Sequence, residues 1–243
     1  MKILISQKKP SSLSAYATLQ EKFGAEIEFH PLYVIEPLSD KEFRAQKINL
    51  QEYTAVVFSS RHAIDAYFKL CESLRIKVPD TMKYFCSTEM VAMYLQKHIV
   101  FRKRKIFFGD GTPNSLISLI GPKHREEKFL ITSTEGSNPV NITKLFSEKK
   151  LSYTVGVLVK PVSQSLKGLD LHSYDFIVLY NPSDVKSLYE NHPDFKQEGI
   201  KFISFGKSIV KAMADAGLET VFQGPTPEAP SAAKAIELCL SSK

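Results

Sequence analysis

The 243-residue sequence contains little cysteine and no long apolar run. Its three cysteines, Cys71, Cys86 and Cys239, lie far apart and form no CxxC motif, which argues against a disulfide framework or a zinc site. We expect all three in the hydrophobic core. The longest apolar runs, such as 155–159, are far shorter than the roughly 20 residues of a membrane span. The first residues resemble a β-strand and not a signal peptide. These absences predict a folded cytoplasmic protein with no membrane partner.

Motifs for metal binding and for nucleophilic catalysis are also missing. The six histidines are scattered without HxxxH or HExxH spacing. No GxSxG elbow and no suitable Cys/His pair occurs. Gly206-Lys207-Ser208 resembles the end of a phosphate-binding loop, but position 201 is Lys201 where that motif requires glycine. The sequence therefore predicts no metal site and no obvious side-chain catalyst.

The charge balance is mildly positive, with 32 Lys and Arg against 26 Asp and Glu and a net charge of +6. This excess favours an anionic partner but is too small to indicate nucleic acid. A nucleic-acid-binding module is one alternative, motivated by the basic run 102–105 and testable by a steep loss of affinity with salt. A solvated surface is the simpler interpretation of that run, so we expect no nucleic-acid partner.

Strand-like and helix-like segments alternate along the chain, which predicts α/β units on parallel sheets. Three strand–helix cycles near the start match three later ones, because residues 2–6 resemble 128–132, 53–60 resemble 174–181, and 85–88 resemble 203–206. The length allows one large domain or two small ones, and the matches favour two similar α/β domains. Two extended stretches that contain proline, 31–37 and 155–161, are predicted strands or strand-like linkers between the cycles.

Small hydroxyl and amide residues follow the predicted strands. In a parallel sheet, ligands bind at the carboxyl ends of the strands, where these turns lie. Two interpretations stay open for each turn: the polar residue caps the following helix, or several helix N-termini together bind carboxylates or phosphates. The six turns are Ser6–Ser12, Ser59–His62, Ser87–Glu89, Thr132–Asn138, Asn181–Asp184 and Gly206–Ser208.

Several of these segments resemble the uroporphyrinogen-III synthase family. Residues 56–64 (VVFSSRHAI) are similar to the family segment vvFTSrnaV, and residues 177–185 (IVLYNPSDV) are similar to FFSPSgv. Residues 202–213 with 216–218 look like aIGptTaraL…Gl, and Pro225-Thr226-Pro227 resembles the sPTp that precedes the last helix. Each motif is short, but their order and spacing extend over nearly the whole chain.

The resemblance implies two similar parallel-sheet α/β domains joined by a two-stranded linker, with a ligand cleft between them. The first domain would be residues 1–33 plus 164–243, the second 39–156, and the linkers 34–38 and 157–163. The implied activity needs no cofactor and no metal. Linear hydroxymethylbilane, a polycarboxylate, loses its terminal hydroxyl as water, and the resulting azafulvene is attacked by the last pyrrole. A spiro intermediate forms and fragments, and closure with that ring inverted gives uroporphyrinogen III. A monomer is expected.

The substrate-binding residues that the resemblance implies belong to four of the turns. They are Ser59, Ser60, Arg61, Ser87, Thr88, Asn181, Pro182, Ser183, Gly206, Lys207 and Ser208.

The sequence departs from the family at its catalytic position. The family commonly has a tyrosine beside the second linker, and an ungapped alignment places Val159 there, which cannot donate a proton. Tyr153 and Tyr180 are weak substitutes, for which a place in the core is the simpler interpretation. Asn181 replaces a family serine. Ser208-Ile209 stand where the family segment has two hydroxyl residues (tT), so one of the two hydroxyl groups remains. Two hypotheses follow: an active synthase, or a divergent, catalytically impaired homologue that binds a tetrapyrrole or another polyanion.

Overall fold

The computed structural model describes residues 1–241, which form two α/β units. Unit 1 consists of Met1–Val34 together with the chain from Val162 onward, and unit 2 is the continuous segment Ile35–Pro161. Each unit has its own mainly parallel sheet with a buried apolar cluster on each face. This architecture confirms the expected α/β fold class.

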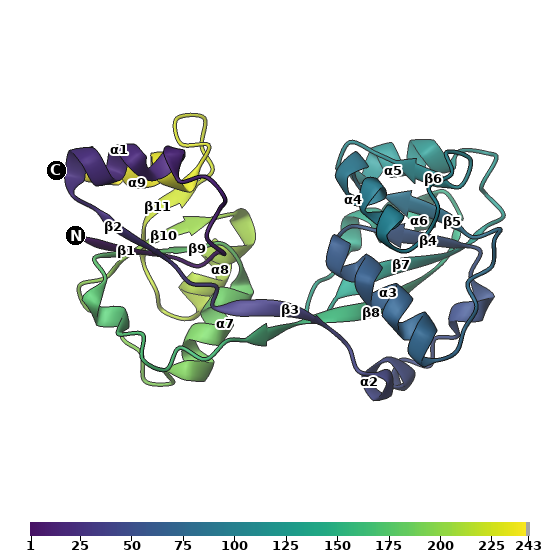
Figure 1. Ribbon diagram of the computed structural model, residues 1–243, viewed down its shortest axis with the longest axis horizontal. Helices are drawn as coiled ribbons and strands as arrows, with labels where there is room; N and C mark the ends of the chain where they lie inside the picture. Colours follow the sequence, from purple (N-terminus) through teal and green to yellow (C-terminus); the bar gives the residue numbers. More distant parts are fainter. Residues whose placement is uncertain (242–243) are drawn as a thin grey trace. The chain divides into compact units, whose positions relative to one another are not determined.

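Unit 1 contains a five-stranded sheet in the order β11-β10-β9-β1-β2, and its neighbouring strands are parallel. Helices α1 and α9 cover one face of this sheet and α7 and α8 cover the other (Figure 1). The strands are β1 (Lys2–Ile5), β2 (Glu26–Phe29), β9 (Phe176–Leu179), β10 (Lys201–Phe205) and β11 (Thr220–Gly224), and the helices are α1 (Ser14–Phe23), the short 3-10 helix η3 (Leu171–Ser173), α7 (Pro182–Asn191), α8 (Lys207–Asp215) and α9 (Ala232–Ser241).

Unit 2 is built around a six-stranded sheet in the order β3-β8-β7-β4-β5-β6. Helices α3 and α4 pack on one face, and α5 and α6 pack on the other. The strands are β3 (Tyr33–Pro37), β4 (Ala55–Phe58), β5 (Lys83–Cys86), β6 (Ile106–Phe108), β7 (Lys128–Thr134) and β8 (Ser152–Ser163), and the helices are α2 (Asp40–Ala45), η1 (Leu50–Glu52), α3 (Arg61–Ser73), α4 (Glu89–Tyr94), η2 (Leu95–Lys97), α5 (Pro113–Ile120) and α6 (Val140–Glu148).

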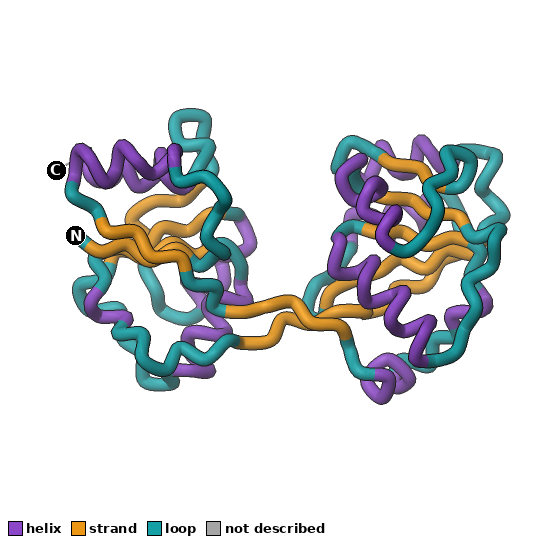
Figure 2. Tube along the Cα trace, in the orientation of Figure 1, coloured by secondary structure: helices purple, strands orange, loops and turns teal. Residues whose placement is uncertain are grey.

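Strands β3 and β8 carry the chain between the units. They lie side by side (Figure 2), and the hydrogen bonds between them show that they run in opposite directions. At one end the N–H of Leu38 donates to the carbonyl of Leu158 at 2.9 Å, and at the other the N–H of Gln164 donates to the carbonyl of Leu32 at 2.8 Å. The segment 157–163 is the second half of the long strand β8, so the linker boundaries expected from the sequence stay a prediction.

The strand order agrees with the internal repeat. Read from its other edge, the sheet of unit 1 has the order β2-β1-β9-β10-β11. Five strands of the unit 2 sheet have the corresponding order β8-β7-β4-β5-β6. The three pairs of matching sequence segments, β1 with β7, β9 with β4 and β10 with β5, occupy equivalent places. The first copy of the repeat therefore supplies β1 and β2 to unit 1 but β4, β5 and β6 to unit 2.

Two of the three cysteines lie in the core, as the sequence predicts, and the third lies at its margin. Cys71 and Cys86 are buried and Cys239 is half-buried, all with free thiols. Cys71 and Cys86 belong to the cluster between sheet 2 and helices α3 and α4. Among residues 1–241, no helix has the length and apolar character to cross a membrane.

Candidate functional site

The eleven residues selected from the sequence all lie where a parallel strand ends and the following helix begins. Ser59–Arg61 follow β4 and Ser87-Thr88 follow the neighbouring strand β5 in unit 2. Asn181–Ser183 follow β9 and Gly206–Ser208 follow the neighbouring strand β10 in unit 1. Because neighbouring parallel strands end at the same edge, each unit brings two of the selected turns together. Their functional roles stay predictions.

Three of the turns are closed by capping hydrogen bonds. Ser60 Oγ accepts the N–H of Ala63 at 3.2 Å, and Thr88 Oγ1 accepts the N–H of Val91 at 3.4 Å. Asn181 Oδ1 accepts the N–H of Ser183 at 3.0 Å. These side-chain oxygens are the N-caps of α3, α4 and α7, so capping is what they do in this structure.

Helix α8 differs because its N-terminus has no side-chain cap. Gly206 is the N-cap, with φ at 130°, a conformation that favours glycine. The N–H groups of the first helical turn lack partners within the helix, and no other partner is found for them in the described part of the chain. Lys207 and Ser208 are exposed and form no ion pair or side-chain hydrogen bond with residues 1–241. Backbone donors, one positive charge and one hydroxyl therefore gather at this turn, which suits a carboxylate.

Arg61 is the positive charge of the selected residues in unit 2. Its guanidinium lies 5.5 Å from the centre of the Tyr94 ring, and it forms no ion pair within the described residues. The Tyr94 hydroxyl donates to Asp65 at 2.8 Å, which fixes the ring. Arg61 therefore packs on a fixed aromatic face with its charge unpaired.

Val159 has no access to a ligand. It is 1% exposed and belongs to the apolar cluster beneath α3. The β7–β8 register shifts at this point, since Ser133 pairs with Val157 and Thr134 with Val159. The position that the alignment assigns to the family tyrosine is thus a core position in this chain.

The two substitute tyrosines lie at opposite ends of their sheets. Tyr153 is the second residue of β8, at the amino end, where its hydroxyl lies 3.0 Å from Ser147 Oγ and its ring packs on Phe146. Tyr180 follows β9 at the carboxyl end and packs against Phe205. Burial, followed by the nearby Tyr16 and Asp184, raises the pKa of Tyr180. Tyr180 is therefore the substitute on the same edge as the selected turns, and its phenol stays protonated.

We expect Tyr153→Phe to change kcat/KM by less than about threefold. The variant loses one exposed hydrogen bond, which contributes about 1 kcal/mol to stability, and it lies at the wrong end of the sheet for substrate binding. Steady-state kinetics of the variant tests this. Loss of turnover with an unchanged melting temperature would place the proton donor at Tyr153.

Two structural features were not anticipated from the sequence. Helices α1 and α6 also lack side-chain caps, because Leu13 and Pro139 occupy their N-cap positions. Asp184, the third residue of α7, is fully buried beside the Asn181 turn. Its spacing of three residues from Asn181 is the signal of a capping box and could have identified it.

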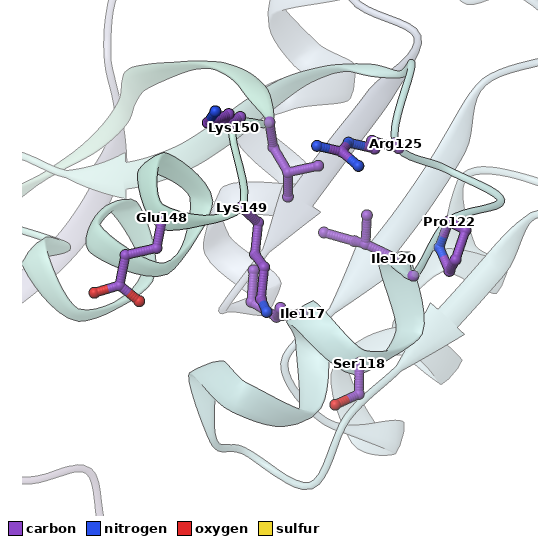
Figure 3. Close-up of a pocket in the computed structure, with 10 residues that line it drawn as sticks. Ile117, Ser118, Ile120, Pro122, Arg125, Glu148, Lys149 and Lys150 are labelled. Carbon is purple, nitrogen blue, oxygen red and sulfur yellow. The ribbon is translucent and has the colours of Figure 1, made fainter.

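A pocket of about 530 Å³ in unit 2 lies away from these turns (Figure 3). It is lined by the ends of α5 and α6 and by the segments that precede β7 and β8, so it is at the amino end of the sheet. Arg125, Lys149 and Lys150 line it together with the apolar side chains of Ile117 and Ile120. Positive side chains near helix C-termini complement the exposed carbonyl groups there. None of the eleven residues selected from the sequence lines this pocket.

Known proteins share this chain's sequence pattern and fold. Residues 14–234 match the family model described as uroporphyrinogen-III synthase HemD. The uroporphyrinogen-III synthetase of Helicobacter pylori 26695 has a similar structure, with a TM-score of 0.58 at 14% identity over 100% of this chain and 99% of that chain. A mutant uroporphyrinogen III synthase from the extremely thermophilic bacterium Thermus thermophilus gives 0.54 at 15% identity, with both chains covered completely. Comparison with curated protein sequences gives no match. At these identities the structures establish the fold, and the family match, which spans most of the chain, establishes that this protein belongs to the uroporphyrinogen-III synthase family.

Proposed function

We propose that this chain closes linear hydroxymethylbilane to uroporphyrinogen III by holding the substrate's carboxylates at the strand-end turns. The observation that carries the proposal is the uncapped N-terminus of α8, where unpaired N–H groups lie beside Lys207 and Ser208. Arg61 supplies an unpaired positive charge in unit 2. The expectation that one substrate contacts the turns of both units stays a prediction.

The residues at these turns suit binding and orientation better than covalent catalysis. The reaction needs a proton for the departing hydroxyl and returns one when the final pyrrole regains its aromaticity, so the overall change is loss of one water. Tyr180 keeps its proton because burial raises its pKa, and it can donate a hydrogen bond to the departing hydroxyl. The two reacting ends already belong to one substrate molecule, so the protein's contribution is to fix which carbon of the last pyrrole meets the azafulvene. We therefore propose that the protein accelerates the reaction mainly by orienting the two ends of the linear substrate.

The chemistry also limits the partners that we propose. The substrate is a small polycarboxylate, in keeping with the net charge of +6. We further propose that the protein works in the cytoplasm as a monomer, without a cofactor and without nucleic acid. Size-exclusion chromatography with light scattering tests the monomer, and a salt titration with duplex DNA tests the nucleic-acid partner.

The decisive experiment separates the isomers of the product. Hydroxymethylbilane, generated in the assay, is converted with and without the purified protein, and the oxidised products are resolved by chromatography. We expect mainly the type III isomer with the protein and the type I isomer, formed spontaneously, without it. Type I alone in both reactions would contradict the proposal and would instead support a homologue that only binds its ligand.

A further inference from the structure

Asp184 fixes the backbone of the turn that carries Asn181 and Ser183. It is 0% exposed, and its Oδ2 accepts the backbone N–H groups of Tyr180 and Asn181, both at 2.9 Å. Its own N–H donates to the carbonyl of Asn181 at 2.8 Å. The carboxylate thus joins the end of β9 to the first turn of α7.

The backbone of this turn has no donor left for a ligand. Pro182 has no N–H, and the N–H of Ser183 donates to Asn181 Oδ1. Because Oδ1 of Asn181 is the acceptor in that bond, its amide donor Nδ2 is identified and has no partner in the described chain. The hydroxyl of Ser183 likewise has no partner among residues 1–241. In contrast to α8, this turn can bind a ligand only through two side-chain donors.

The other oxygen of Asp184 lacks a hydrogen-bond partner, which is costly for a buried carboxylate. Oδ1 and the nearby Ser6 Oγ are both buried and unpartnered. Ser6 is close enough to favour the charged carboxylate, although the pair does not reach hydrogen-bond geometry. Tyr33 and Tyr180 are the titratable groups influenced by this charge. Within the described chain no cation pairs with it, so the backbone N–H groups of Tyr180 and Asn181 are the groups that hold this buried charge.

We propose that Asp184 is a positioning residue that holds the turn so that Asn181 Nδ2 and Ser183 Oγ donate to a carboxylate of the substrate. The inference rests on the proposed function and extends it to a residue outside the selected set. Asp184 itself does not touch the substrate, because it is fully buried. We expect its effect on substrate affinity, through the Asn181 turn, because the Tyr180 ring is held separately by its packing against Phe205.

Kinetics of two variants test this role. Asp184→Ala removes the acceptor of two backbone N–H groups, and we expect KM to rise about tenfold or more with kcat within threefold, as for the loss of hydrogen bonds to a charged group. Asp184→Asn keeps an oxygen that can accept both bonds, so KM should stay within threefold of the wild type. The matched control is Asp170→Ala, which removes the acceptor of the His172 N–H, 3.1 Å away, at the amino end of β9. It should leave KM unchanged.

The melting temperature provides a second test, because Asp184→Asn should stabilise the protein although it leaves KM nearly unchanged. Burial raises the pKa of Asp184 to about 6, above its usual value. The charged form is therefore disfavoured in the folded state at pH 8, and this penalty disappears as the pH falls through 6 and below. Asp184→Asn should melt at a higher temperature than the wild type at pH 8, with a smaller difference at pH 5. A purely structural role would change stability without changing KM.

Asn181→Asp keeps the test decisive if Asp184→Ala does not fold. Aspartate caps a helix as well as asparagine does, but it replaces the free Nδ2 donor with a negative oxygen, so KM should rise at least tenfold. A wild-type KM in Asn181→Asp, or no rescue by Asp184→Asn, would overturn the proposal. Failure of the proposed function appears separately, as type I product from the wild-type protein.

Discussion

Ser208→Asp is expected to raise KM about 100-fold while leaving the protein at least as stable. Ser208 is the second residue of α8, two positions after the N-cap Gly206, which provides no side-chain cap. An aspartate there would occupy the free N–H groups and repel a substrate carboxylate. Hydrogen bonds to charged groups contribute about 1.5–3 kcal/mol, and like charges add to the loss, which together correspond to roughly two powers of ten in affinity. The same negative charge stabilises the helix N-terminus by about 0.3–1 kcal/mol.

Two controls separate charge from structure in this experiment. Ser208→Asn keeps a hydrogen-bond donor and adds no charge, so KM should rise far less than in Ser208→Asp. Asn114→Asp places the same charge at the second residue of α5, a helix that Thr112 already caps. It should change KM little. An unchanged KM in Ser208→Asp would show that α8 does not bind the substrate.

Phe129→Ala is expected to destabilise unit 2 by about 3–5 kcal/mol, the usual effect of removing a large buried aromatic ring. Phe129 is 0% exposed on β7, with its ring centre 5.5 Å from that of Phe85 and 5.2 Å from that of Phe146. Since a domain is stable by only about 5–15 kcal/mol, this is a large fraction of the total. Urea unfolding followed by circular dichroism measures it.

A control for Phe129→Ala is Val140→Ala, because Val140 is 51% exposed at the start of α6. This variant should lie within about 0.5 kcal/mol of the wild type. A loss below about 1 kcal/mol in Phe129→Ala would mean that the contacts between β7 and helices α5 and α6 do not stabilise the unit.

The repeated strand–helix pattern was predictable because it depends on local sequence. Residues 53–60 combine an apolar run with Ser60 at the end, and they form β4 followed by the cap of α3. What a polar turn residue does was not predictable, because a capping serine and a ligand-binding serine look alike in sequence. The hydrogen bonds of Ser60, Thr88 and Asn181 decide between the two interpretations, and the absence of a cap at Gly206 is visible only in three dimensions.

The buried residues around the site depend on contacts that are distant in sequence. Asp184 is buried beside Ser6, which is distant in sequence, so the capping-box spacing identifies the residue but does not show that it is buried. The burial of Val159 likewise depends on a register shift between β7 and β8. An ungapped alignment pairs each residue with a position of the family pattern. It does not show which way the side chain points next to such a register shift.

Unit 1 is built from two segments that are separated in sequence by the whole of unit 2, which affects its folding during synthesis on the ribosome. Strand β1 lies between β2 and β9, and Ile3 pairs with Phe176, about 170 residues later. At roughly 5–20 residues per second, one edge of β1 waits about 10–35 seconds for its neighbour. Unit 2 is continuous and can complete its sheet during that time. The nascent chain therefore exposes an apolar strand edge for much of its translation, and such an edge can pair with another chain unless a chaperone covers it.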